Sequence, residues 1–474
     1  MVSWPIGLRA RKLDRMGLLT LIASLYFLQY WGLALNDASV WPHDRNAKML
    51  LIAMSALGIL LPRLYGVMLV NALAYVAAYG MAMPVASNNQ TTAFFVCLVI
   101  LAGAAVTLSN PQTRHSGQFR ERIFTSIAGP GRYILAGLYF YGIYHKINTD
   151  FLNPEVSCAV ALYRPLAMPF GLEDWRFAHF GAIYATFVVE FLAMILLFSP
   201  RFKRVGMALG IPFHIVIGWT GYAFYKDFST VVLALYAMFL TAEILDRANL
   251  AAARLLGGER RACEIGRLVL IAVFGLYLVL TVGANRSAGL VPTHEGFTWF
   301  FSVYALAFLV FAIAFVPMRM SDPLTDLAIR PPVLAIFPIL FFLNGASPYL
   351  GLKTESSIAM FSNLYTEGNE TNHLIHGQLP FAAGYQNDLV VPLESNDAGF
   401  DRRFLREGQA MVRYEFDRAI AGYDQLQVVF SHNGGPPRTL DGGWENTYLA
   451  ASPLLRSYLV FKPVELSRPH PCTH

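Results

Sequence analysis

Long apolar stretches dominate the first 350 residues, with little of the alternation typical of soluble helices or strands. A membrane-spanning helix needs about 20 mostly apolar residues in a row, and eleven segments approach this length. The predicted spans are 17–35, 47–61, 64–83, 92–108, 131–146, 177–198, 205–224, 229–245, 268–284, 298–317 and 333–350. The pattern therefore predicts an all-α polytopic membrane bundle of about eleven transmembrane helices, which occupies residues 1–351.

The apolar pattern ends near residue 352, and a different composition follows. Residues 353–474 contain 10 basic and 14 acidic residues and no stretch long enough to span a membrane. Turn sequences such as Gly434-Gly435-Pro436-Pro437 are frequent there. Leu426–Phe430 and Tyr458–Lys462 have the pattern of strands, and Tyr414–Ile420 that of a short helix. Residues 352–474 are thus predicted to form a small α+β domain.

The overall composition supports this division and excludes several classes of protein. Hydrophobic residues make up 55% of the 474-residue chain and charged residues 14%, against roughly 25% charged residues in soluble domains. The mean hydropathy is +0.45. A single soluble domain, a nucleic-acid-binding protein and a disordered chain are excluded, because so few charges cannot solvate so much apolar surface. We expect the lipid bilayer as partner and no nucleic acid.

The distribution of basic residues predicts the orientation of the chain. The N-terminal segment and the even-numbered connections between spans contain 19 Lys and Arg residues, whereas the odd-numbered connections contain 7. Cytoplasmic loops carry the excess of positive charge, so the N-terminus is predicted to be inside. Eleven spans then make residues 352–474 extracytoplasmic, in a multi-pass protein of the plasma or inner membrane.

Cysteine and histidine spacing gives no indication of a metal site. Cys97, Cys158, Cys263 and Cys472 form no CxxC or zinc-type pattern. Cys158 and Cys472 are both predicted outside, and the sequence leaves open whether they form a disulfide. His373-Leu-Ile-His376 supplies two potential ligands without a third, which is typical of a polar loop rather than a metal site.

Lys146, at the end of the fifth predicted span, has two interpretations. It is either a lysine whose ammonium group reaches the membrane interface or a desolvated amine that acts as a base. Tyr139 and Gly142 lie seven and four residues before it, on the same helix face, and the glycine allows close approach. Tyr141 and His145 form a neighbouring i, i+4 pair.

Two further ionisable residues lie in the middle of predicted spans, where charges are costly and often functional. His214 either bonds to a neighbouring helix or orients a substrate and shuttles protons. Glu190 is either the partner of a buried His or Lys, a protonated acid, or a functional carboxyl. Trp219, with Tyr139 and Tyr141, either lines a cavity for a flat apolar ligand or packs against lipid and protein.

The segment Tyr139–Leu152, with the sequence YFYGIYHKINTDFL, resembles the signature of the horizontally transferred transmembrane domain (HTTM) family, which includes the vitamin K-dependent gamma-carboxylases. That signature is an aromatic-rich span ending in Gly-x-x-Lys-Leu-x-x-Asp-Trp. Val188–Leu197 and Phe213-His214 are similar to later parts of the family pattern, and the resemblance covers residues 10–320. His145 replaces a second lysine of the carboxylase, and Phe151 replaces its tryptophan.

The resemblance implies an enzyme that uses a quinol, such as reduced vitamin K, at the outer membrane face. In the carboxylase the lysine of the motif deprotonates the quinol. Oxygen then converts the quinol to an epoxide through a strongly basic intermediate, which abstracts a proton from glutamate before carbon dioxide adds. Lys146 occupies the position of that base, with His145 and His214 as orienting or proton-shuttling groups and Glu190 as a supporting acid. The outer domain is much smaller than the lumenal part of the carboxylase, which argues against a glutamate-rich protein client.

Two other classes of function remain open from the sequence. One is a transporter or channel, in which Glu190 and His214 mark a pathway through the membrane. The other is a non-catalytic membrane subunit that binds a protein partner through residues 352–474. An enzyme that uses Lys146 as base loses its function when this lysine is replaced, whereas a non-catalytic subunit does not.

Overall fold

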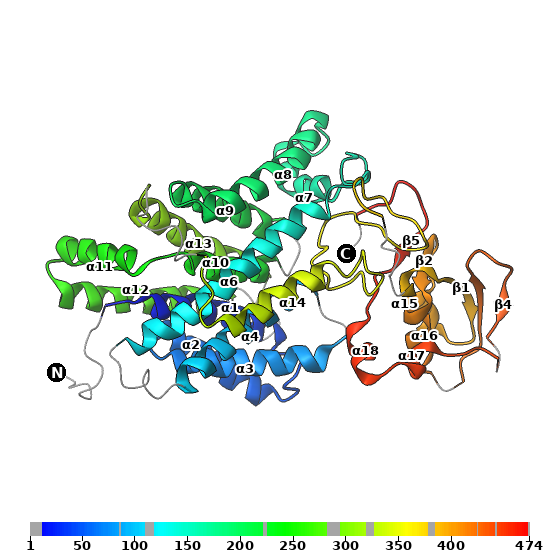
Figure 1. Cartoon of the computed structure of the whole chain (residues 1–474), viewed down its shortest axis with the longest axis horizontal. Coiled ribbons are helices and arrows are strands. Elements are labelled where there is room, and N and C mark those ends of the chain that lie inside the picture. The colour runs from blue at the N-terminus through cyan, green and yellow to red at the C-terminus, as the bar shows by residue number, and fades with distance from the viewer. Residues whose placement is uncertain are drawn as a thin grey trace. The chain divides into compact units, whose positions relative to one another are not determined.

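The computed structural model describes residues 12–472 apart from 85–86, 110–117, 221–224, 282–293, 319–326, 378–383, 424 and 441–442. The chain is mostly helical, and a small antiparallel sheet forms near its C-terminus (Figure 1). It divides into two compact units. The first comprises Met1–Met81, Thr92–Ala136 and Val189–Ile339, and the second comprises Ala82–Thr91, Gly137–Val188 and Leu340–His474. The second unit thus contains residues 352–474 together with segments from the predicted membrane region.

Each of the eleven predicted spans contains a helix. The helices up to residue 345 are α1 (Arg15–Ala34), α2 (Arg45–Leu60), α3 (Tyr65–Ala82), α4 (Asn88–Ser109), α6 (Phe119–Tyr144), α7 (Cys158–Ala167) with the 3₁₀ turn η1 (Met168–Phe170), α8 (Arg176–Phe198), α9 (Lys203–Gly218), α10 (Tyr225–Ala237), α11 (Ala242–Leu256), α12 (Glu259–Thr281), α13 (His294–Phe315), the 3₁₀ turn η2 (Pro332–Ala335) and α14 (Ile336–Gly345).

Six of the described helices, namely α1, α3, α4, α8, α12 and α13, are long and apolar enough to cross a membrane. The helices at the other predicted spans are shorter or more polar, and the ten-residue α14 is the shortest of them. On α12 only 6% of the apolar window is buried inside the protein, so this helix presents its apolar side chains outward. These features are compatible with a membrane protein.

The predicted span 229–245 is not one straight helix, because α10 and α11 meet at an angle of 98°. Two arginines bind the carbonyl groups at this break. Arg132 donates to the carbonyl of Met238 (2.6 and 2.9 Å), and Arg15 donates to that of Leu240 (3.2 Å). The cationic groups satisfy carbonyls that a continuous helix would use internally, and the chain turns there.

Helix α1 forms the centre of the first unit, where it packs against α2 and α10. Two of its buried polar side chains bond to other helices. Gln29 donates to Thr230 and to the hydroxyl of Tyr304, and the indole of Trp31 donates to Asn71 (3.0 Å). Such hydrogen bonds satisfy polar groups that lie between apolar helices. They also connect α1 with α3, α10 and α13.

The C-terminal part of the second unit is an α+β fold, as the sequence predicts. Its elements are the 3₁₀ turn η3 (Tyr385–Asn387), β1 (Leu389–Ser395), α15 (Ala398–Phe404), β2 (Gln409–Val412), α16 (Arg413–Ile420), β3 (Val428–His432), β4 (Arg438–Thr439), α17 (Thr447–Ala450), α18 (Pro453–Tyr458) and β5 (Val464–Glu465). The strand order is β4-β3-β1-β2-β5, and every neighbouring pair is antiparallel.

Two small apolar clusters stabilise this fold. One contains Val412, Tyr414 and Leu459, and the other contains Val390 and Phe430 with residues of α15 and α16. The predicted strand 458–462 is wrong: Tyr458 ends α18, and the next residues are irregular. Their side chains are buried in the first cluster, which explains the strand-like apolar pattern.

A disulfide joins Cys158 at the start of α7 to Cys472 near the end of the chain, with a Cα–Cα distance of 4.9 Å. Both cysteines belong to the second unit. Cys158 is fully buried in a cluster with Phe151 and Ile183. The structure thereby shows that the two cysteines, whose pairing the sequence leaves open, form a disulfide. This bond closes a loop of more than 300 residues.

Close packing of α1 on α2 yields the first prediction. A Cβ atom at Gly58 would overlap the hydroxyl of Ser24 and lie 3.0 Å from Val67, whereas one at Gly80 would meet nothing within 4 Å. We expect Gly58→Leu to destabilise the protein by about 1–3 kcal/mol through overpacking. Gly80→Leu, the control on α3, should leave stability nearly unchanged. Thermal unfolding of the purified proteins in detergent measures both; equal stability of the two variants would contradict the observed α1–α2 contact.

Candidate functional site

The lysine motif forms the last turn of α6 and the chain that leaves it. The backbone N–H of His145 donates to the carbonyl of Tyr141 (3.1 Å), and that of Lys146 donates to Ile143 (3.0 Å). This tighter second bond ends the helix, so Lys146 lies in the turn. Lys146 is only 6% exposed, and its ammonium nitrogen lies 5.8 Å from the ring centre of Phe151. A cationic side chain is therefore enclosed at the end of an apolar helix.

His145 is fully buried, and both of its ring nitrogens face hydrogen-bonding groups. Nδ1 lies 2.8 Å from the hydroxyl of Tyr349, and Nε2 lies 3.4 Å from the carbonyl oxygen of Ser357. A carbonyl only accepts hydrogen bonds, so the proton belongs on Nε2 and the tyrosine hydroxyl donates to Nδ1. This arrangement fixes the imidazole in one tautomer and one orientation.

Aromatic rings fix the position of His145 further. Tyr141 stacks on it at a ring-centre distance of 4.9 Å, and Tyr349 stacks at 5.5 Å. The ring of Tyr141 lies directly against the backbone of Gly345 on α14, where a Cβ atom would overlap it. A close approach is thus made at Gly345, and the one predicted at Gly142 stays a prediction. Tyr139 is buried two residues before Tyr141 on α6.

His373 supports the same turn through backbone contacts. Its Nδ1 accepts the N–H groups of Ile375 (3.3 Å) and His376 (3.0 Å), and its Nε2 lies 2.9 Å from the carbonyl of Tyr144. Both ring nitrogens of His373 therefore have hydrogen-bond partners. Burial lowers the pKa of His373 below its usual range. Among the residues that the structure describes, no group of three or more His, Cys, Asp or Glu side chains is placed to hold a metal ion.

An irregular but buried segment, residues 351–369, packs beside the motif. Ser356, Ile358, Phe361 and Asn363 all have φ between 50 and 65°. Most non-glycine residues avoid this region of backbone space, and a β-branched residue such as isoleucine is rare there. Strained backbone of this kind is concentrated at functional sites, where the surroundings hold it in place.

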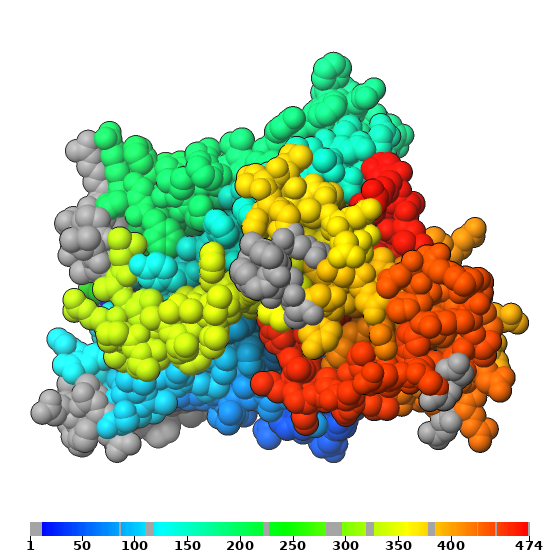
Figure 2. Space-filling view, turned by 45° about the vertical axis from the view of Figure 1, so that its right-hand side comes forward, coloured from blue at the N-terminus to red at the C-terminus, as the bar shows by residue number. Residues whose placement is uncertain are grey.

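The surroundings of this segment are the C-terminal residues of the same unit. The N–H groups of Thr354 and Glu355 donate to the carbonyl of Val460 (3.1 and 3.2 Å). Figure 2 shows the segment, in yellow, beside the orange and red residues that end the chain. The backbone of residues 351–369 is therefore stabilised by contacts within the second unit.

Three asparagines connect this segment to the lysine motif. Asn148 donates to the carbonyls of His145 (2.7 Å) and Ser362 (2.6 Å). Asn363 accepts the N–H of Cys158 (2.7 Å), next to the disulfide. Asn372 donates to the carboxylate of Asp150 (2.8 Å) and to the carbonyl of Asn363 (2.7 Å). These bonds hold the turn that carries Lys146 against residues more than 200 positions away.

A second buried lysine lies in the same unit. Lys353 is 1% exposed, and its ammonium nitrogen lies 4.5 Å from the ring centre of Tyr458. Burial lowers the pKa of Lys353 to about 8, against the opposing effect of the Glu355 carboxylate. Burial also raises the pKa of Glu415 to about 7, although Arg418 opposes this shift. Both groups are outside the predicted spans.

The remaining predicted site residues belong to the first unit. His214 on α9 is 2% exposed and lies among the rings of Phe213, Phe228 and Tyr236. Its environment is an aromatic core between α9 and α10.

Glu190 is buried on α8. Trp219 follows α9; its indole donates to Ser302 (2.9 Å), and its ring meets Trp299 edge-on at 4.7 Å. Tyr139, Tyr141, Gly142, His145 and Lys146 are thus brought together in the second unit, whereas Glu190, His214 and Trp219 are part of the first.

Sequence reasoning missed Tyr349, Ser357 and the asparagines around the lysine turn. The available signal was the group of Asn and Ser residues between 344 and 372, because asparagine tolerates positive φ and its amide can bond to backbone. No family model, curated protein or solved structure matches this chain. Its activity must therefore be inferred from its own residues and geometry.

The buried Lys353 should make the free energy of unfolding depend on pH between about 8 and 10.5. A lysine whose folded pKa is depressed contributes stability above its unfolded value of 10.5, and this contribution is lost as pH falls through 8. We expect the stability of the wild type to rise relative to Lys353→Met by up to about 3 kcal/mol between pH 8 and 10.5. Unfolding temperatures measured across this range test it; parallel curves would contradict the burial of the charge.

Glu415 provides an internal control, because burial shifts its pKa upward whereas it shifts the pKa of Lys353 downward. Its folded pKa is raised, so its contribution is present below the unfolded value of 4.5 and is lost as pH rises through about 7. Glu415→Gln should therefore flatten the stability curve between pH 4.5 and 7 and leave the alkaline window unchanged. An effect of both substitutions in one window would indicate a general loss of folding rather than titration.

Proposed function

We propose that this chain is a multi-pass membrane protein with eleven spans, a cytoplasmic N-terminus and an extracytoplasmic C-terminal domain. Six long apolar helices and the outward-facing apolar side chains of α12 support the membrane assignment. The excess of basic residues in alternate connections supports the orientation. The Cys158–Cys472 disulfide supports it independently, because such bonds persist in oxidising compartments.

Reporter fusions test this topology. Alkaline phosphatase is active only outside the cytoplasm, whereas green fluorescent protein matures in the cytoplasm. We expect the full chain to give an active phosphatase and a dark fluorescent protein when each is fused after residue 474, and the reverse for fusions within 246–267. A fluorescent C-terminal fusion would contradict the proposed extracytoplasmic location of the C-terminal domain.

We further propose that the chain is a quinol-oxidising enzyme in which Lys146 acts as base at the outer face. The observation that carries this proposal is the enclosure of Lys146, which is 6% exposed beside Phe151. A general base must lie within hydrogen-bond reach of the hydroxyl whose proton it takes, and an amine enclosed beside an aromatic ring can meet a flat apolar substrate there. The resemblance of Tyr139–Leu152 to the motif of the carboxylase family suggests a quinol hydroxyl as the donor of that proton.

The proposed chemistry begins with transfer of the quinol hydroxyl proton to the Nζ atom of Lys146. The resulting quinolate is electron-rich, and molecular oxygen is the oxidant that takes up its electrons. His145, fixed by Tyr349 and Ser357, positions the turn and orients the substrate. Tyr139 and Tyr141 supply flat apolar surfaces suited to a quinone ring. Proton transfer by His214 and support by Glu190, both in the first unit, remain predictions.

Quinol-dependent oxygen uptake by membranes that contain the protein tests this function. We expect Lys146→Ala to reduce the rate by about 100-fold or more, in the range observed for loss of a general base. Lys353→Met is the matched control, because it removes another buried lysine of the same unit and should leave the rate unchanged. Expression and unfolding temperature are checked for each variant.

Two results would overturn the enzymatic proposal. Full activity of Lys146→Ala would exclude this lysine as the base. Absence of oxygen uptake by the wild type, with naphthoquinols and benzoquinols alike, would exclude quinol oxidation and leave the topology proposal standing.

A further inference from the structure

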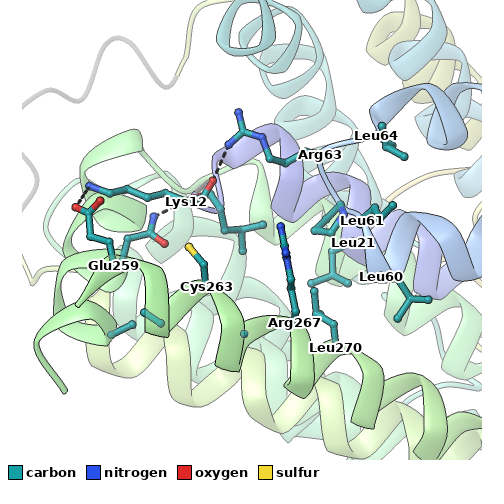
Figure 3. Close-up of a pocket in the computed structure, with 16 residues that line it drawn as sticks. Lys12, Leu21, Leu60, Leu61, Arg63, Leu64, Glu259, Cys263, Arg267 and Leu270 are labelled. Carbon is teal, nitrogen blue, oxygen red and sulfur yellow. Dashed lines mark hydrogen bonds and ion pairs between the residues drawn. The ribbon is translucent and has the colours of Figure 1, made fainter. Parts of the chain in front are cut away.

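A cavity of about 490 Å³ lies in the first unit, far along the chain from the lysine motif (Figure 3). It is bounded by the residues that precede α1, by the connection between α2 and α3, by α11 and by α12. Its volume is within the range of small-molecule binding sites. None of its lining residues takes part in the proposed quinol chemistry.

The lining of this cavity combines cationic and apolar side chains. Lys12, Arg63 and Arg267 contribute three positive charges, and Glu259 contributes one negative charge. Lys12 pairs with Glu259 (2.8 Å). The apolar lining consists mainly of leucines: Leu13, Leu21, Leu60, Leu61, Leu64 and Leu270. In Figure 3, Arg267 extends from α12 toward α1, with leucines beside it. The complementary ligand is amphipathic and anionic.

The charges lie where the surrounding helices change from polar to apolar. On α12 all charged residues lie between Glu259 and Arg267, and none follows up to Thr281. Arg63 lies two residues before α3, which contains no charged residue. Leu268 and Ile271 are more than half exposed. In a bilayer this transition marks the boundary between headgroups and hydrocarbon.

Backbone contacts hold the cationic rim in place before any ligand binds. Arg63 donates to the carbonyl of Lys12 (2.9 Å), and Asn249 on α11 donates to that of Leu13 (2.9 Å). Arg120 binds Asp14 through two hydrogen bonds of 2.7 and 2.8 Å, which fixes the start of α1. A preorganised site loses less entropy when its ligand binds.

We propose that this cavity binds an anionic phospholipid, with the headgroup phosphate at Arg63, Arg267 and Lys12 and the start of one acyl chain against the leucines. Basic pockets between transmembrane helices on the cytoplasmic side bind acidic lipids in this way. The acyl chain of a zwitterionic lipid can also pack against the leucines, but its quaternary ammonium group is repelled by Lys12, Arg63 and Arg267. The site therefore selects anionic over zwitterionic headgroups.

The full-length protein, placed in nanodiscs of phosphatidylcholine with increasing phosphatidylglycerol, provides the test. After transfer to a mild detergent, native mass spectrometry counts the lipid molecules that remain bound. We expect the wild type to retain a single phosphatidylglycerol at low mole fraction. Arg63→Gln with Arg267→Gln should weaken retention about tenfold or more, because each arginine near a headgroup contributes about a fivefold gain in affinity.

A steric variant tests the cavity without changing charge. Gly266 lines the cavity, and a Cβ atom there would meet nothing within 4 Å, so Gly266→Phe should fill the space without disturbing the fold. Gly275→Phe is its control, because Gly275 lies on the same helix in equally open surroundings and does not line the cavity. Arg122→Gln with Arg254→Gln is the charge control at exposed positions away from it.

The outcomes separate the lipid from other sources of phosphate. Loss of retention in the cavity variants but not in the controls supports the proposal. Equal retention in all variants, or no preference for phosphatidylglycerol over phosphatidylcholine, overturns it. Displacement of the lipid by inorganic phosphate or glycerophosphate at concentrations close to those of the lipid also overturns it, because the site would then bind soluble phosphate and not use its apolar wall.

Discussion

Asn148 makes hydrogen bonds to several separate parts of the second unit through one side-chain amide. Its NH₂ group donates to the carbonyls of His145 and Ser362, and its oxygen accepts the N–H of Phe151 (2.7 Å). A buried polar side chain that satisfies so many backbone groups is expensive to replace, because every partner would be left without a hydrogen bond. The position of the turn that carries Lys146 depends on this amide.

The same constraint explains why residues 351–369 are irregular and yet buried. These residues provide carbonyls to His145, Asn148 and Asn372, which a helix or strand would have used internally. Left-handed backbone at Ser356 and Ile358 allows the chain to turn without regular secondary structure. The Cys158–Cys472 disulfide connects the end of the chain to the same unit. Order in this part of the protein comes from side-chain-to-backbone bonds.

The first unit satisfies its buried polar groups in a different way. Gln29 and Trp31 bond to side chains on neighbouring helices, whereas Arg132 and Arg15 bond to carbonyls at the break between α10 and α11. Paired polar groups between apolar helices specify which helices are neighbours, since apolar contacts alone are not directional. The break between α10 and α11 lies where the guanidinium groups of Arg132 and Arg15 bind these carbonyls.

The sequence by itself located a helix in each predicted span, because a long run of apolar residues is a local property that needs no partner. It did not locate α7 or most of α11, which lie in predicted connections. All eleven predicted spans contain helices, and a small α+β fold follows them. It also singled out Lys146 and His145, since ionisable residues stand out in an apolar chain. It did not determine the break in 229–245, where arginines from other helices bind the exposed carbonyls.

Only the tertiary structure decided which distant segments meet. The contacts of His145 with Tyr349 and Ser357, the pairing of Cys158 with Cys472, and the separation of His214 from Lys146 into different units involve residues tens to hundreds of positions apart. Local hydropathy contains no information about such pairings. They depend on the tendency of buried polar groups to find hydrogen-bond partners, and distant segments supply such partners only in the folded chain.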